Sequence, residues 1–78
     1  MWGYEAQART LKPGEYHPDR RVQVDMVDAI VQGKLRISLE GESRTLTPGD
    51  CLFLPKGVVT SVEVVGDRPV VCLEALQA

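Results

Sequence analysis

Apolar and polar residues alternate one by one along much of this chain. The clearest run covers residues 34–39, where Leu35, Ile37 and Leu39 are separated by a lysine, an arginine and a serine. A period of two places every second side chain on the same face of a β-strand. No stretch keeps a 3.6-residue period over the length that a helix needs. The pattern therefore predicts an all-β protein.

Turn residues divide the chain into short segments. The predicted strands cover residues 2–8, 21–26, 29–32, 34–39, 43–47, 51–54, 58–65 and 70–76, and the polar segment 16–19 is expected to be part of a loop. Glycine and proline stand between the strands, and Gly33 is a candidate hairpin turn. Short strands that recur about every 8–12 residues, with turns between them, are typical of a β-sandwich or β-barrel.

The length and charge limit the classes of function. A chain of 78 residues forms one domain, residues 1–78, with a small core. A formal net charge of −2 gives no reason to expect a nucleic acid or an anionic membrane as partner. No segment approaches the roughly 20 apolar residues of a membrane span, and no secretory leader is visible. We therefore expect a cytoplasmic protein.

The two cysteines, Cys51 and Cys72, lie in different apolar segments and have no CxxC spacing. Free cysteine behaves as a small buried hydrophobic residue, and disulfides are rare in the cytosol. We expect two reduced thiols with a structural role.

The glycines and prolines also form a recognisable skeleton. One part of this skeleton resembles the second motif of the cupin family. It consists of Gly49, then five residues, Pro55, one further residue and Gly57. Gly33, followed by the alternating strand 34–39, resembles the end of the first cupin motif. The resemblance extends over residues 19–76 and implies a small single-domain jelly-roll barrel.

In metal-binding cupins the first motif supplies two histidines and a glutamate, and the second motif supplies a third histidine. The resemblance places these positions at Arg20, Val22, Met26 and Thr60, or at Asp19 and Arg21 for the histidine pair in the alternative spacing. None of these is a histidine or a glutamate, and methionine and threonine are poor ligands for a divalent cation. We therefore expect no metal and no other cofactor.

Two enzymatic alternatives involve His17, the only histidine. His17, Asp19 and Asp25 could form a displaced metal site of an oxygenase or isomerase, although Asp25 has the opposite strand parity from Met26. Metal-free relatives that are sugar-nucleotide epimerases use a histidine, an aspartate and a tyrosine, and Tyr16, His17 and Asp19 supply these residue types.

We prefer a non-enzymatic function, either as a small-molecule-binding protein or as an accessory protein. Arg20, Val22, Met26 and Thr60 would line an apolar, metal-free lumen, and Arg20 would hold an anionic group of the ligand. A purely structural or interaction module, whose lumen is filled by its own side chains, is the remaining alternative.

The N-terminal strand, within residues 1–11, has an apolar face. Trp2 and Tyr4 share this face with Ala6 and Ala8. Aromatic residues are enriched at protein interfaces, and twofold symmetry is the commonest arrangement of oligomers. We expect this strand to lie at the interface of a homodimer.

Overall fold

The computed structural model describes residues 3–77, and within that range every regular element is a β-strand. The strands are β1 (Tyr4–Leu11), β2 (Tyr16–Arg21), β3 (Met26–Gln32), β4 (Lys34–Leu39), β5 (Glu42–Leu46), β6 (Cys51–Leu54), β7 (Val59–Val65) and β8 (Val70–Gln77). The all-β prediction is confirmed. The part of the chain described here contains no helix that could cross a membrane.

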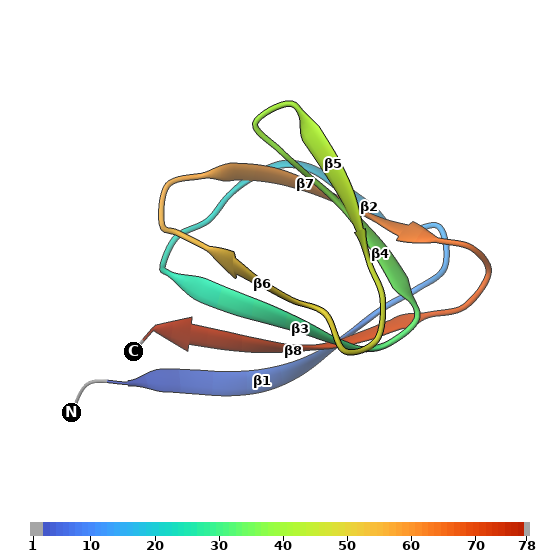
Figure 1. Cartoon of the computed structure of the whole chain (residues 1–78), viewed down its shortest axis with the longest axis horizontal. Helices are drawn as coiled ribbons and strands as arrows, with labels where there is room; N and C mark the ends of the chain where they lie inside the picture. The colour runs from blue at the N-terminus through green and yellow to red at the C-terminus, as the bar shows by residue number, and fades with distance from the viewer. Residues whose placement is uncertain (1–2, 78) are drawn as a thin grey trace.

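The strands form two four-stranded antiparallel sheets. One sheet has the order β1-β8-β3-β6, and the other has the order β2-β7-β4-β5 (Figure 1). Neighbouring strands in each sheet are mostly distant in sequence, and this order is consistent with a jelly-roll barrel. The space between the two sheets holds both the core and the candidate site.

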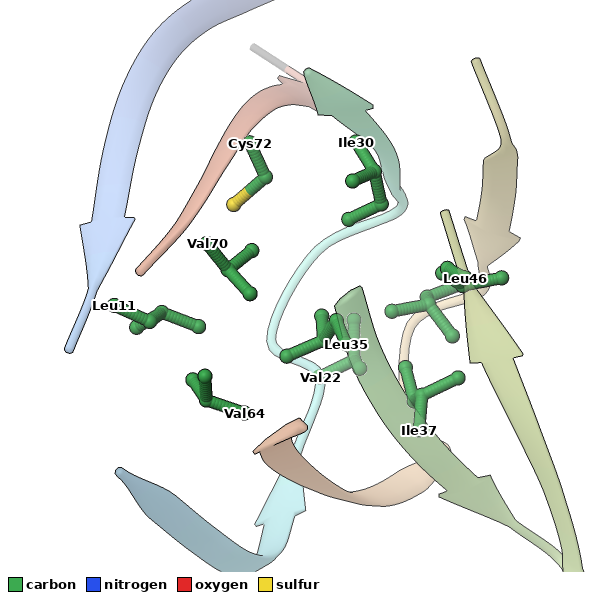
Figure 2. Close-up of a cluster of buried hydrophobic side chains, with 10 residues drawn as sticks. Leu11, Val22, Ile30, Leu35, Ile37, Leu46, Val64, Val70 and Cys72 are labelled. Carbon is green, nitrogen blue, oxygen red and sulfur yellow. The ribbon is translucent and has the colours of Figure 1, made fainter. Parts of the chain in front are cut away.

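The core lies where the inner faces of the two sheets meet, and Figure 2 shows its side chains pointing toward one another. Val70 is completely buried, and the other buried apolar residues come from both sheets and from the segments that join them. They are Leu11, Val22, Ile30, Leu35, Ile37, Leu46, Leu54, Val64 and Cys72. The predicted strand at 34–39 is therefore confirmed, with Leu35 and Ile37 facing inward.

The sequence interpretation was wrong around residues 16–26. Residues 16–19 belong to strand β2, whereas residues 22–25, which were expected to be extended strand, connect β2 to β3. A proline is tolerated in β2 because this strand is at the edge of its sheet. The strand also bulges between His17 and Arg20, with Asp19 at a φ of 47°.

Gly33 marks a turn as predicted, but this turn is not a paired hairpin. It joins β3 in one sheet to β4 in the other. Its φ is +84°, and an added Cβ would lie 2.4 Å from the carbonyl oxygen of Pro69. Glycine is thus required here both by backbone conformation and by close approach of another segment.

The outer face of the β1-β8-β3-β6 sheet is apolar and exposed. Register pairs Ala6 with Ala75, Ala75 with Val27, and Val27 with Phe53, so apolar side chains form a row across all its strands. We define the outer apolar face as Tyr4, Ala6, Ala8, Val27, Ala29, Cys51, Phe53, Leu73 and Ala75. None of these residues carries a charge, whereas 26% of the chain is charged.

Three members of this face are large and about half exposed, namely Tyr4 at 53%, Phe53 at 52% and Leu73 at 47%. Trp2, which was expected to join them, lies outside the described residues. Both cysteines are free thiols. Cys72 is buried as expected, but the same expectation for Cys51 was wrong, because Cys51 has the strand parity that faces outward.

Candidate functional site

A cavity of about 270 Å³ lies between the two sheets. Arg20, Val22, Met26 and Thr60, the four residues predicted to line a lumen, are all part of its wall. Apolar side chains from the surrounding strands complete much of the remaining surface, among them Leu11, Leu35, Leu54, Val62 and Leu76. Whether these residues bind a ligand stays a prediction.

Backbone pairing positions the predicted residues. Thr60 on β7 is 7% exposed and pairs with Arg20 on β2, whose carbonyl oxygen accepts a 3.5 Å hydrogen bond from the Thr60 hydroxyl. The amide of Val22 donates to the carbonyl of Val58, and the amide of Gly57 donates to the carbonyl of Val22, each at 2.8 Å. These bonds fix the connection between β2 and β3 against the segment that precedes β7.

A buried polar layer crosses the cavity, and the sequence interpretation missed it. Asp28 on β3 and Glu74 on β8 are paired across the two strands and are 6% and 7% exposed. One oxygen of Glu74 accepts from the side-chain amide of Gln7 at 3.1 Å, and the other accepts from Arg9 Nη1 at 3.4 Å. The lumen is therefore mixed, and the prediction that it is apolar was wrong at this layer.

Asp28 differs from Glu74 in its partners. Its Oδ1 atom is buried and has no hydrogen-bond partner among the described residues. Burial is the main cause that raises the pKa of Asp28 to about 6, followed by the charge of Glu74. The charge of Arg9 opposes this rise, and a hydrogen bond to Glu74, which only the protonated Asp28 carboxyl can donate, adds to it. At neutral pH the cavity thus contains a carboxylate that is costly to ionise.

Cys72 lies on β8 near Asp28 and Glu74, and its pKa is raised by the same kinds of cause as that of Asp28. Burial is the largest cause that raises the pKa of its thiol, to about 11, and the charges of Asp28 and Glu74 add to that effect. The thiol therefore stays protonated and is a poor nucleophile.

Strand parity could have revealed the polar layer. Asp28 is two residues after Met26, and Glu74 is two residues after Cys72, so each shares a face with a residue that was expected to be buried. A carboxylate in such a position is unusual and indicates either a paired charge or a functional group.

The displaced metal site around His17 is not formed. His17 Nε2 lies 2.6 Å from Glu15 Oε2, and Asp25 Oδ1 accepts from the backbone amide of Lys56 at 2.7 Å. The backbone amide of Asp19 is bonded to the hydroxyl of Ser61. Among residues 3–77, no three side chains of histidine, cysteine, aspartate or glutamate converge as a metal site would require.

Glu15 is the actual partner of the histidine. Its pKa is lowered mainly by the hydrogen bond from the backbone amide of Lys12 and then by the bond to His17. Tyr16 is 57% exposed and, as the neighbour of His17 on strand β2, has the opposite parity. Tyr16, His17 and Asp19 therefore do not converge on the cavity as an acid–base group.

The residues at the usual metal-ligand positions also do not suit a divalent cation. Arg20, Val22, Met26 and Thr60 provide a guanidinium, methyl groups, a thioether and one hydroxyl. Divalent cations in proteins require imidazole, carboxylate or thiolate ligands. These four positions therefore do not fit such a metal, and the carboxylates of the cavity belong to no group of three possible ligands among residues 3–77.

Comparison with known proteins supports one family. A family model described as a cupin domain matches residues 7–76. No curated protein matches the chain in sequence. Solved structures match it well, and in the three described next the chain covers less than two thirds of the other protein.

The DMSP lyase DddQ from Ruegeria pomeroyi superposes with a TM-score of 0.85 at 26% identity, over 97% of this chain and 39% of the lyase. A cupin domain from Schizosaccharomyces pombe superposes with a TM-score of 0.86 at 18% identity, over 97% of this chain and 52% of the other. The EutQ protein of Clostridium difficile superposes with a TM-score of 0.80 at 19% identity, over 95% of this chain and 56% of EutQ. The two latter likenesses show a shared fold.

Proposed function

Because the chain belongs to the cupin domain family, we propose that it binds a small molecule in the cavity between its two sheets. The observation that carries this proposal is the cavity itself, which has a volume of about 270 Å³. This is just below the usual size of ligand pockets, so the ligand is small. The wall combines apolar side chains with a few polar groups, as ligand sites generally do.

Arg20 is the group in this proposal that binds an anionic part of the ligand. It lines the cavity, and its side chain is exposed to solvent. A guanidinium can hold a carboxylate through two parallel hydrogen bonds. The proposed ligand therefore has an apolar body that enters the lumen and an anionic group that stays near Arg20.

The proposed role is binding without catalysis, as a small-molecule-binding or accessory protein in the cytoplasm. The poor fit of the four usual ligand positions to a divalent cation supports this choice over a metal-dependent oxygenase or isomerase. DddQ is named as a lyase, but this chain spans only 39% of that protein. A structural module with a filled lumen is less well supported, because the cavity is present.

Calorimetric titration with pentanoate tests the proposal. The wild-type protein should bind it, and Arg20→Gln should weaken binding by about tenfold or more, as expected for loss of a hydrogen bond between charged groups. Val62→Trp should abolish binding because the larger side chain fills the cavity. Arg36→Gln is the matched control, since Arg36 pairs with Glu63 away from the cavity. Binding that survives Val62→Trp would exclude the lumen as the site.

We also propose that two copies of the chain associate through the outer apolar face. The absence of charge over that face, in a chain with 26% charged residues, favours a second copy over a charged partner. An uncharged face is complementary to itself, as a twofold interface requires. Burying it would also add apolar contacts to a protein with a small core.

A further inference from the structure

We propose that Asp28 anchors the ligand by binding a protonated amino group inside the cavity. This inference rests on the proposed function, because it takes the cavity as a ligand site, and it names the chemical class of that ligand. The ligand would be a small molecule with an amino group at one end, a short apolar chain, and an anionic group at the other end near Arg20.

The geometry of Asp28 carries the inference. Asp28 lines the cavity and is 6% exposed, and its Oδ1 atom has no partner among the described residues. Buried polar side-chain atoms nearly always have a hydrogen-bond partner, and an unpaired one destabilises the protein. The protonated Asp28 carboxyl can donate to Glu74, but the ionised carboxylate is an acceptor only, so the partner that it lacks must be a donor. A ligand in the cavity can supply it.

The neighbouring charges favour a cationic donor over a neutral one. Glu74 is already balanced, since its two oxygens accept from Gln7 and Arg9. Arg9 is the cation of this layer, and its recorded ion pair is with Glu74. The ionised Asp28 therefore has no cationic partner of its own within the polar layer. An ammonium group on the ligand would balance it.

Of the charged groups that line the cavity with Asp28, Glu74 and Arg9 shift its pKa, whereas Arg20 and Arg21 are not among the causes of that shift. Glu74 and Cys72 lie on β8, Arg9 lies on β1, and the wall from β6 is apolar at Leu54. The charge of Glu74 affects the pKa of Asp28 more than the charge of Arg9 does. The thiol of Cys72 also senses the two carboxylates more strongly than Arg9. Two separate groups thus indicate a negative potential in the polar layer, which stabilises a cation.

Two ligands that differ in one group test the inference, namely pentanoate and 5-aminopentanoate. In the wild-type protein the amino group should strengthen binding by about tenfold or more, as expected for a hydrogen bond between charged groups. In Asp28→Asn, which keeps the shape of the side chain, the amino group should weaken binding, because its desolvation is no longer offset. The sign of the amino-group effect therefore reverses.

The outcomes separate this inference from the proposed function. If both ligands bind equally, or if Asp28→Asn keeps the gain from the amino group, the inference is wrong and the proposed function stands. If neither ligand binds, pentylamine decides. Binding of pentylamine that is lost in Asp28→Asn would support Asp28 and contradict the role of Arg20. No binding of any of the three would overturn the proposed function and the inference together.

Glu74→Gln is a second variant that keeps the test valid if Asp28→Asn does not fold. It leaves Asp28 in place and removes the negative charge opposite it. The amino group should still strengthen binding, but by a smaller factor than in the wild-type protein. An unchanged factor would contradict the electrostatic part of the inference.

Discussion

Asp28 on β3 lies directly opposite Glu74 on β8, and both carboxyl groups are buried between the sheets. Like charges that face each other across strands are destabilising, and burial adds a desolvation penalty to each. Gln7 and Arg9 compensate Glu74, whereas Asp28 has an oxygen with no partner among residues 3–77. This pair therefore lowers the free energy of unfolding of the domain at neutral pH. Functional sites often carry such a stability cost, so the pair is consistent with a binding role.

Asp28 should make the stability depend on pH. The ordinary pKa of its carboxyl is 3.8, whereas in the folded protein it is about 6. Between these values the folded state holds a proton that the unfolded chain has released. The contribution of Asp28 to the free energy of unfolding therefore falls as the pH rises from about 4 to about 6. Above that range the loss is on the order of 2–3 kcal/mol.

Asp28→Asn should remove this loss. At pH 7.5 we expect the variant to be more stable than the wild-type protein by about 1–3 kcal/mol, and the difference should shrink as the pH falls to 4. Urea denaturation across this pH range measures it. Glu63→Gln on the exposed side of β7 is the control and should change the stability by less than about 0.5 kcal/mol. A variant that is less stable than the wild type at pH 7.5 would contradict the assignment.

Arg9→Met should destabilise the fold, because it leaves the buried Glu74 with Gln7 as its remaining partner. We expect a loss of about 1–3 kcal/mol, less than for a fully buried pair, since the Arg9 side chain is 38% exposed. The pKa of Asp28 should rise further, which carbon-detected NMR titration of the carboxyl would measure. Arg36→Met, which breaks an exposed pair with Glu63, should cost less than about 1 kcal/mol. Equal losses in the two variants would show that burial of Glu74 is unimportant.

Gly33→Ala should be among the most damaging single changes. The residue has a φ of +84°, and the new Cβ would meet the Pro69 carbonyl oxygen at 2.4 Å. We expect a loss of about 3 kcal/mol or more, or failure to fold. Gly41→Ala provides a matched control, since Gly41 has a φ of +81° but open space around it. That variant should lose only about 1 kcal/mol, as thermal or chemical denaturation would show.

The sequence predicted those parts of the fold in which one face of a strand is apolar and the other is polar. The strand at 34–39 is the clearest case, and Thr60 was correctly expected to face inward. The prediction was poorer for β3, because its apolar residues occur on both faces, one covered by the core and the other forming the outer apolar face. A pattern with two apolar faces does not reveal which one is inside.

The missed elements have physical causes of the same kind. Strand β2 contains Pro18 and mostly polar residues, and its extended conformation depends on pairing with β7, which is distant in sequence. Asp28 was missed because a charged residue is normally exposed. It is buried here by its place in the register opposite Glu74. Neither the pairing nor the register can be determined from the local sequence.

Charge on the outer apolar face should prevent the proposed dimer. Phe53→Glu and Leu73→Glu each place a carboxylate among apolar side chains, and its burial would be unfavourable. Sedimentation velocity should show a dimer for the wild-type protein and a monomer for both variants. Val59→Glu is the control, because Val59 is 41% exposed but belongs to the other sheet. A wild-type monomer at high concentration would rule out the proposed interface.

The most direct test of ligand binding in the lumen is a titration of the isotope-labelled protein with 5-aminopentanoate, followed by amide NMR shifts. We expect saturable shifts concentrated at cavity-lining residues, above all Asp28, Thr60 and Val62, with little change at Phe53 and Leu73 on the outer apolar face. Shifts confined to that outer face would contradict a ligand site in the lumen, and no shifts with either 5-aminopentanoate or pentylamine up to millimolar concentrations would contradict it as well.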